Sequence, residues 1–368
     1  MYQINPDMLH EITQYLTLPE IKKLGTCSKY GYETCKKTVP YSYSQHGFTE
    51  YYVKMNTIKW MIENCDENRL HSAIVKKLDI CSIHFGSGFN QSIEALASCT
   101  NLKQITFGGE FNQSIEALAS CTNKYSLFNQ PVEALASCIN LQQITFGHDF
   151  NQPIKAFANC TNLQRITFSK SFNQPVGALT RCTNLRQIIF GERFNQPVEA
   201  LVKCTNLRQI TFGCYFNKPI TALAKCTNLQ QITFGSWFNQ PIEALASCAN
   251  LQQIKFGYKF NQSIEALVHC TNLRQITFGC LFNQPIGAFA NCTNLQQITF
   301  GEMFNQSVRA LSNCTSLQQI MFGLRFNRSV EALARCTNLQ QITLSRYFNK
   351  PIIILRIMRP GLRIHRVH

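Results

Sequence analysis

Cysteine is the residue type in this sequence with the most evident chemical potential, because the chain holds 18 cysteines among its 368 residues. Thiols at suitable spacings form disulfides, bind zinc or act as nucleophiles. Twelve of these cysteines recur at one position of a sequence repeat: Cys99, Cys121, Cys138, Cys160, Cys182, Cys204, Cys226, Cys248, Cys270, Cys292, Cys314 and Cys336. Side chains stacked in such a column, about 4.8 Å apart, point the same way and give poor disulfide geometry. We therefore predict a ladder of reduced, buried thiols that pack as small apolar side chains.

Other reactive residue types form no recognisable constellation. A metal site needs a second kind of ligand beside the cysteine column, and His269 alone does not supply one. Cys27 and Cys35 flank basic residues, but no partner histidine can be assigned to them. The sequence has no P-loop, no G-x-G-x-x-G after a strand, no H-E-x-x-H and no C-x-x-C pair. It therefore predicts a protein that is not an enzyme and needs no cofactor or metal.

The elements that carry these residues follow from a fixed period. The dipeptide Phe-Asn begins at residues 89, 111, 128, 150, 172, 194, 216, 238, 260, 282, 304, 326 and 348. Every gap is 22 residues except the 17 between Phe111 and Phe128. Counted from its Phe as position 1, a typical unit reads F-N-Q-P-I-E-A-L-A-x-C-T-N-L-Q-Q-I-T-F-G-x-x. Self-similarity of this kind decides the architecture before local propensity does.

Each unit predicts one strand and one short helix. Leu, Ile and Phe at positions 14, 17 and 19, with Thr at 18, indicate a short strand, which Gly at position 20 ends with a turn. Pro or Ser at position 4 suits a helix start, and apolar residues at positions 5, 8 and 11 share one face of roughly two helical turns. One such coil is too small to bury a core alone, so neighbouring coils must stack.

Phenylalanine and asparagine columns complete the predicted scaffold. Of the 27 Phe residues, 13 fall at position 1 and 11 at position 19, counting Phe85 of the half-coil before the first unit, so two phenylalanine columns should form the interior. Asn occupies position 2 in all thirteen units and position 13 in eleven of twelve, with Ser316 as the exception. We predict that these amides satisfy backbone groups of the turns, because a role repeated in every coil is structural.

The run F-N-Q-P-I followed by L-x-x-I-x-F-G resembles the FNIP repeat, a relative of the leucine-rich repeat in slime-mould proteins and in proteins of giant amoeba viruses. The resemblance covers Ile80 to about Leu355. In this version Gln replaces the usual Ile after Asn, and Ala-Leu-Ala-x-Cys replaces the Leu-rich helix turn. The resemblance implies an α/β fold: a leucine-rich-repeat-like, right-handed solenoid of 22-residue strand-plus-short-helix coils.

The N-terminal segment predicts a separate all-α module of three short helices. Apolar residues share one face of the first helix, a capping box from Thr17 to Glu20 opens the second, and Ser28 can cap the third. This order resembles an F-box, which docks a substrate receptor onto the Skp-type adaptor of a cullin ubiquitin ligase. That resemblance implies an adaptor-binding face made of Pro6, Leu9, Ile12, Leu16, Ile21 and Leu24. A helical cap over the open end of the solenoid is the alternative.

The predicted domain organisation has four parts. They are an F-box-like segment at 1–37, a helical connector and N-terminal cap at 38–88, the repeat solenoid at 89–350 with a shortened coil at 111–127, and a C-terminal cap or basic tail at 351–368. In the connector we expect two helices, one with Ile58, Met61 and Ile62 and one with Ala73, Ile74 and Leu78. Ile80, Ile83 and Phe85 repeat the strand spacing of the units and predict a half-coil.

The C-terminal segment and the shortened coil depart from the repeat. Leu362, Ile364 and Val367 predict a last edge strand that Arg359, Arg363 and Arg366 would guard against further pairing. A basic tail for nucleic acid is the alternative there. In the shortened coil only residues 124–127 remain where nine normally stand. They reach about 13 Å, too short for a strand and a turn, so we expect the array to bend or fray there.

Recognition surfaces are predicted from positions that vary while the scaffold repeats. Variation concentrates at positions 21 and 22, which should line one rim of the sheet. The aromatic residues Tyr215, Trp237 and Tyr258 are the candidate substrate-binding residues there, since aromatics are enriched at interface centres. Unselected drift in a turn is the alternative. Residues 150–227 hold ten Lys and Arg against two Glu, a basic band that favours an acidic partner. Its candidate contacts are Arg165, Arg186 and Arg208.

These predictions favour the substrate-receptor subunit of a cullin-type (SCF-like) ubiquitin ligase, with an acidic protein as target. A stand-alone scaffold that binds an acidic protein or nucleic acid is the alternative. No run of 18 apolar residues is present to span a membrane. Asp7, His10 and Glu11 lie where a signal peptide needs an apolar core. We therefore expect no membrane partner and a location in the cytoplasm, that of the host if the protein is viral, or in the nucleus.

Overall fold

The computed structural model describes residues 39–42, 50–54, 57–62, 82–85, 103–106, 135–136 and 138–367. The chain divides into two compact units, Met1–Gln174 and Pro175–His368. The predicted F-box-like segment at 1–37, the predicted helix at Ala73, Ile74 and Leu78, and the shortened coil at 111–127 lie outside the described residues.

The strands of the first unit pair in chain order. They are β1 (Val39–Ser42), β2 (Glu50–Lys54), β3 (Thr57–Ile62), β4 (Ser82–Phe85), β5 (Gln104–Thr106), β6 (Gln143–Thr145) and β7 (Arg165–Thr167). Pairing is antiparallel from β1 to β3 and parallel from β3 to β7. The half-coil predicted around Ile83 is confirmed as a strand, because Ile83 of β4 pairs with Ile105 of β5.

The helix predicted from Ile58, Met61 and Ile62 is wrong, because these residues form β3. Six residues are too few to separate a helical spacing from a strand, and Ile58, Trp60 and Ile62 also alternate with period two. Pairing decides the outcome: β3 hydrogen-bonds with β2 on one side and with β4 on the other. The connector is therefore not all-helical.

The strands on either side of the shortened coil pair with each other. Ile105 of β5 pairs directly with Ile144 of β6. The backbone N–H groups of Gln142 and Gln143 both donate to the Lys103 carbonyl, at 2.9 and 3.0 Å. The hydrogen-bond ladder therefore runs from β5 directly to β6. The bend or fraying that we expect there stays a prediction.

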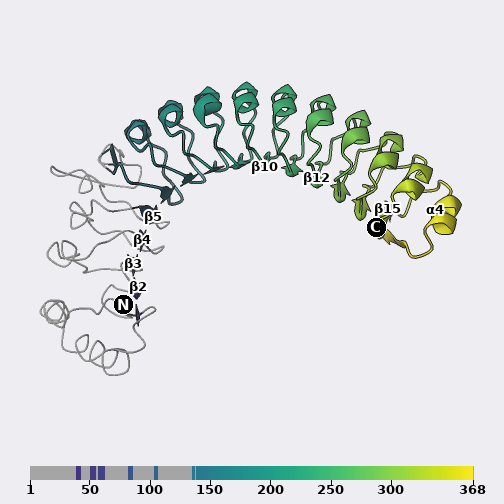
Figure 1. The fold of residues 1–368 in the computed structure, drawn as a ribbon, viewed down its shortest axis with the longest axis horizontal. Helices are drawn as coiled ribbons and strands as arrows, with labels where there is room; N and C mark the ends of the chain where they lie inside the picture. Colours follow the sequence, from purple (N-terminus) through teal and green to yellow (C-terminus); the bar gives the residue numbers. More distant parts are fainter. Residues whose placement is uncertain are drawn as a thin grey trace, which may run out of the picture. The chain divides into compact units, whose positions relative to one another are not determined.

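The second unit consists of regular coils. Its strands are β8 (Gln187–Ile189), β9 (Gln209–Thr211), β10 (Gln231–Thr233), β11 (Gln253–Lys255), β12 (Gln275–Thr277), β13 (Gln297–Thr299), β14 (Gln319–Met321), β15 (Gln341–Ser345) and β16 (Arg363–Val367). All pair in parallel with a register step of one repeat from β8 to β15. Figure 1 shows β10, β12 and β15 along one side of the coils and the helical turns along the other. The predicted last edge strand is confirmed, because β16 pairs with β15.

The short helices predicted in each coil are 3₁₀-helices of four or five residues. They are η4 (Lys155–Ala158) in the first unit and η5 (Gly177–Arg181), η6 (Glu199–Lys203), η7 (Thr221–Lys225), η8 (Glu243–Ser247), η9 (Glu265–His269), η10 (Gly287–Asn291), η11 (Arg309–Asn313) and η12 (Glu331–Arg335) in the second. The spacing of three between positions 5, 8 and 11 is the 3₁₀ period. Accordingly, Leu179 N–H donates to the Val176 carbonyl and Cys182 N–H to the Leu179 carbonyl, both at 2.9 Å. The last coil has an α-helix instead, α4 (Ile353–Met358).

The phenylalanine columns form the interior as predicted. Phe212 stacks on Phe216 with ring centroids 3.9 Å apart, and on Phe234 of the next coil at 5.7 Å. The same pattern recurs along the described coils, where Leu, Ile and Cys at the remaining inward positions are also buried. Phe157 and Phe289 stand outside both columns. They replace the usual Leu at position 8 and are fully buried there.

The asparagine ladders are confirmed in the described coils. At position 2 the carboxamide oxygen of each Asn accepts from the backbone N–H of the next, as between Asn217 and Asn239 at 3.0 Å. At position 13 the carboxamide nitrogen donates to the preceding coil, as from Asn228 to the Thr205 carbonyl at 3.0 Å. These bonds satisfy turn groups that neither the strands nor the 3₁₀-helices reach.

Glycine at position 20 has a different cause from the predicted turn. A Cβ atom added to Gly235 would lie 1.9 Å from the carbonyl oxygen of Gly213 in the preceding coil. The same approach recurs along the column from Gly213 to Gly323. The backbones of neighbouring coils therefore touch at this column, and glycine is needed because no side chain fits.

Candidate functional site

The variable positions 21 and 22 lie between the end of each strand and the next core phenylalanine. Their backbone is held in register from coil to coil. Tyr215 N–H donates to the Glu192 carbonyl at 3.0 Å, Trp237 N–H to the Cys214 carbonyl at 2.9 Å, and Lys259 N–H to the Ser236 carbonyl at 2.8 Å. The scaffold thus presents side chains of unrelated type at a fixed spacing along one rim.

Aromatic side chains on three consecutive coils are exposed on this rim. The exposed fraction is 49% for Tyr215, 45% for Trp237 and 53% for Tyr258. Tyr215 and Trp237 are in contact, with ring centroids 6.1 Å apart and an interplanar angle of 32°. Lys259 places its Nζ 3.5 Å from the centre of the Trp237 ring, a cation–π contact. We call Tyr215, Trp237, Tyr258 and Lys259 the rim cluster.

Lys259 is the member of the rim cluster that the sequence analysis missed. It occupies position 22, the same column as Tyr215 and Trp237, whereas Tyr258 occupies position 21. Residues one period apart in a column are spatial neighbours in a stacked array. The repeat period therefore held the signal for the Lys259–Trp237 contact.

Tyr258 belongs to a second set of contacts along the rim. The Cys280 thiol donates to Glu302 Oε2 at 3.5 Å. The adjacent Cys280 raises the pKa of the Tyr258 phenol, by electrostatic interaction and by a hydrogen bond. Desolvation and the neighbouring Glu302 raise the pKa of Cys280. A thiol that keeps its proton is a weak nucleophile, so these contacts shape the surface rather than provide a reactive group.

Arg186 and Arg208, two of the candidate arginines, lie apart from the rim cluster. Arg186 and Arg208 are exposed and occupy successive coils immediately before β8 and β9, with Arg208 N–H donating to the Arg186 carbonyl at 2.8 Å. They stand at the start of the strands, whereas the rim cluster follows the strand ends. Arg165 lies in β7 of the other compact unit and is also exposed.

Other members of the predicted basic band face a different side of the second unit. Exposed cations close the successive 3₁₀-helices η5, η6 and η7: Arg181, Lys203 and Lys225. The predicted band is therefore divided between the strand side and the helix side of the coils.

The cysteine column is reduced and buried, as predicted. Its described members from Cys160 to Cys336 are fully buried, and Cys138 is partly buried. The thiols point to backbone carbonyls of the preceding coil, as from Cys204 Sγ to the Leu179 oxygen at 3.5 Å. Burial raises the pKa of Cys204 from 9.0 to about 12. Cys99 and Cys121 lie outside the described residues.

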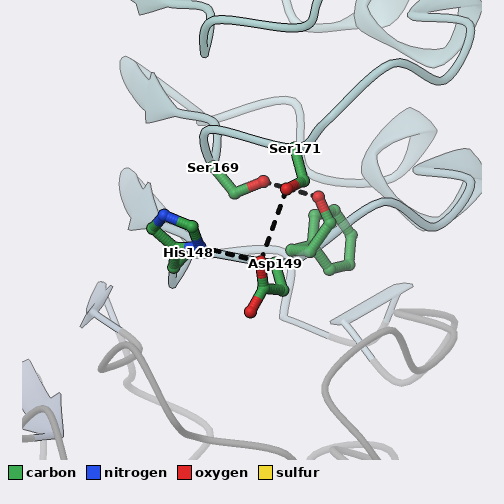
Figure 2. A network of polar contacts seen from close by, with 5 residues as sticks. His148, Asp149, Ser169 and Ser171 are labelled. Atoms are coloured by element: carbon green, nitrogen blue, oxygen red, sulfur yellow. Dashed lines mark hydrogen bonds and ion pairs between the residues drawn. The ribbon is translucent and has the colours of Figure 1, made fainter.

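A histidine, an aspartate and a serine meet at one exposed site of the first unit. His148 Nδ1 lies 2.7 Å from Asp149 Oδ1, and Ser171 Oγ donates to the same oxygen at 3.4 Å. Figure 2 shows both side chains converging on Asp149, while Ser169 donates to the Phe150 carbonyl at 2.5 Å. A catalytic triad needs the imidazole between carboxylate and hydroxyl. Here the carboxylate is in the middle, so His148 is not placed to activate Ser171.

The repeats match a known family. The family of BspA type leucine rich repeat regions matches residues 131–222, 200–284, 219–307 and 285–351, which together span more than half of the chain. The chain belongs to this family. The predicted leucine-rich-repeat solenoid is thereby confirmed. Among curated proteins, none matches the sequence.

Solved structures of leucine-rich-repeat proteins resemble this one. The internalin InlF from Listeria monocytogenes is 17% identical with a TM-score of 0.66, over 84% of this chain and 86% of its own. CroV588, described as a circular leucine-rich-repeat protein, is 26% identical with a TM-score of 0.56, over 86% of this chain and 54% of its own. The Toll–Spatzle complex of Drosophila gives 14% identity and a TM-score of 0.64, over 94% of this chain and 49% of its own. The chain thus spans about half the length of the last two.

In the part of the chain that the structure describes, no three His, Cys, Asp or Glu side chains gather as metal ligands would. The same residues include no helix of the length and apolar character needed to cross a membrane.

Proposed function

We propose that the leucine-rich-repeat array binds a protein partner through the rim cluster. The observation that carries this proposal is the exposure of Tyr215, Trp237 and Tyr258 on consecutive coils of a scaffold that otherwise repeats. Large aromatic side chains that are half exposed leave apolar area for a partner to cover. Because the backbone beneath them is hydrogen-bonded from coil to coil, little conformational entropy is lost when a partner binds.

The charge around the rim cluster favours an acidic partner surface. Lys259 stacks on Trp237, and exposed Arg193 precedes Tyr215 by one period in the same column. A partner carboxylate beside Trp237 would meet Lys259, while the apolar part of the partner covers the indole ring. Trp, Tyr and Arg are the residue types most enriched in binding hot spots, so Tyr215, Trp237 and Arg193 are the candidate anchors.

Replacing Trp237 with alanine is expected to weaken partner binding by about 2 kcal/mol, the cost of losing an aromatic anchor. Ser236→Ala, one residue away on the same turn, is expected to leave affinity unchanged. The measurement is titration calorimetry with a protein recovered on the full chain from host-cell lysate. Equal losses for the two variants would place the partner on another face.

We propose further that residues 1–37 dock a Skp-type adaptor, so that the chain serves as the substrate receptor of a cullin-type ubiquitin ligase in the cytoplasm or nucleus. The support comes from the sequence, in which Pro6, Leu9, Ile12, Leu16, Ile21 and Leu24 match an F-box face. The repeats add to this support, since FNIP-type repeats are often paired with an F-box in the viral proteins that they resemble. The rim cluster would then select the protein to be ubiquitinated.

Adaptor docking is tested on the predicted first helix. The double variant Leu9→Asp and Ile12→Asp is expected to abolish capture of the adaptor, because two carboxylates cannot be buried in an apolar interface. The control variant His10→Asp and Gln14→Asp adds the same charge on the other side of that helix and should still capture it. Pull-down of adaptor and cullin is the measurement, with circular dichroism to verify the array. Capture by the Leu9→Asp and Ile12→Asp chain would contradict the ligase proposal.

A stand-alone scaffold is the second candidate, favoured by the exposed cations that close η5, η6 and η7. An acidic protein or a nucleic acid could bind there without any adaptor. Such binding falls steeply as salt rises, because phosphate or carboxylate contacts are screened. Recovery of a partner without adaptor and cullin, in a salt-sensitive manner, would favour this candidate.

A further inference from the structure

The last coil of the array carries an exposed apolar face. Helix α4 buries Leu355 on one side, yet the exposed fraction is 60% for Ile353, 41% for Ile354, 69% for Ile357 and 61% for Met358. Ile353 and Ile357 are four residues apart, as are Ile354 and Met358, so the four side chains share one side of the helix. Figure 1 shows α4 at the outer side of the final coil. We call these four side chains the apolar face.

Two residues of the apolar face occupy repeat positions that are polar or Gly in all preceding repeats. Ile353 and Ile357 occupy positions 6 and 10 of their unit. In every preceding unit position 6 holds Glu, Lys, Arg, Thr or Gly, and position 10 holds Ser, Asn, Arg, Lys or His. Both positions are solvent-exposed along the described 3₁₀-helices of the second compact unit, Pro175–His368. Isoleucine at both positions of one unit is therefore not required by the scaffold.

The last part of the chain, which carries the apolar face, is positively charged. After Glu331 the sequence contains seven Lys and Arg and no Asp or Glu. Arg359 and Arg366 serve the fold, because they donate to the carbonyls of Leu339 and Phe348 at 3.2 and 2.6 Å. Lys350 and Arg356 are exposed beside or within α4. The surface thus combines protruding aliphatic side chains with cations.

This combination discriminates between possible occupants. A nucleic acid would use the cations but gain nothing from four exposed aliphatic side chains. A second copy of the chain would bring the same positive charge against itself, and four side chains fall short of the roughly 800 Å² per partner of a stable interface. Side chains that are 41–69% exposed protrude and do not line a groove for a peptide. An anionic lipid surface takes up both features, since aliphatic side chains enter the headgroup boundary and cations meet the lipid charge.

We propose that the apolar face of α4 inserts into the surface of an anionic membrane, with Lys350 and Arg356 on the lipid headgroups. A peripheral contact of this kind needs no membrane-spanning segment. From the sequence we expected no membrane partner because no apolar run is long enough to span a membrane. It is independent of the rim cluster and of the adaptor.

The test is vesicle flotation with the full chain. Vesicles of phosphatidylcholine with about one-third phosphatidylserine are expected to bind the chain, and vesicles of phosphatidylcholine alone at least about tenfold less. Ile353→Thr with Ile357→Asn introduces residues that other units carry at these positions and should lower binding about tenfold or more. Lys350→Gln with Arg356→Gln should lower it and weaken its salt dependence. Lys255→Gln with Arg274→Gln removes the same charge from exposed positions of other coils and should leave binding unchanged.

A second readout does not depend on loss of binding. Ile357→Trp keeps a large apolar side chain at the centre of the apolar face, so its fluorescence should shift to shorter wavelength when anionic vesicles are added. The proposal is overturned if the chain binds neither kind of vesicle, or if it binds both equally. It is equally overturned if the Ile353→Thr and Ile357→Asn chain binds anionic vesicles as well as the parent chain does. It is also overturned if the parent chain binds no vesicles and this variant instead loses a protein or nucleic acid partner.

Discussion

Replacing Gly235 with alanine is expected to destabilise the coil array by about 3 kcal/mol or more. The added Cβ would lie 1.9 Å from the Gly213 carbonyl oxygen and 2.7 Å from the Cys214 Cα. Both atoms belong to the backbone, and the strands before them, β9 and β10, are hydrogen-bonded to each other. Neither coil can withdraw without breaking part of that ladder, so the clash must separate neighbouring coils. Urea unfolding followed by circular dichroism measures the loss.

Gly177→Ala is the matched control, because Gly177 lies in the same compact unit, Pro175–His368. No atom lies within 4 Å of the Cβ that it would add at the start of η5. Removing a glycine there restricts the unfolded chain and is expected to stabilise the array by about 0.5 kcal/mol. Similar unfolding midpoints for the Gly235→Ala and Gly177→Ala chains would contradict the close-approach explanation.

The array is also expected to lose stability steeply above pH 9, because its buried thiols resist ionisation. Burial raises the thiol pKa from 9.0 to about 12 in Cys182, Cys204, Cys226, Cys270 and Cys314, and to about 11 in Cys248, Cys292 and Cys336. The unfolded chain releases these protons near pH 9, whereas the folded chain retains them. Stability is therefore complete below pH 9 and falls as pH rises from there, by about 1.4 kcal/mol per pH unit for each thiol.

Cysteine variants separate this effect from the titration of other groups. Replacing Cys204 and Cys226 with alanine should reduce the pH dependence of the free energy of unfolding, between pH 9 and 11, by about 2.8 kcal/mol per pH unit. Cys214→Ala, which removes a rim thiol instead, is the control for loss of a cysteine. Urea unfolding at several alkaline pH values supplies the free energies. An unchanged slope in the Cys204→Ala and Cys226→Ala chain would show that the ladder does not govern alkaline unfolding.

Much of the fold was predictable from the period alone. In a stacked array, residues one period apart are neighbours. A residue type that recurs at one position of the repeat therefore contacts its counterpart in the next coil. Phe216 and Phe238 stack because both stand at position 1, and Asn217 bonds Asn239 because both stand at position 2. The same logic placed the cysteines in a buried column and the aromatic residues Tyr215 and Trp237 side by side on the rim.

Part of the candidate site was not predictable. The repeat period predicts which residues of neighbouring coils are in contact, but it does not predict on which side of the coil a side chain lies. The predicted arginines and aromatics lie at opposite ends of the strands, since Arg208 precedes β9 and Tyr215 follows it. The basic band likewise divides between Arg208 on the strand side and Arg181 at the end of η5. Only the path of the chain within a coil separates them.

The sequence by itself determined the leucine-rich-repeat array, its interior columns and its variable rim, because every one of these features is repeated. Only the tertiary structure decided the features that occur once or depend on backbone contact. Residues 57–62 became β3 because β2 and β4 pair with them, although a helical spacing was also present. Gly235 is needed because Gly213 of the preceding coil touches its backbone. Ile357 is exposed because α4 leaves that side of the last coil uncovered, and such exposure depends on packing between elements rather than on any local pattern.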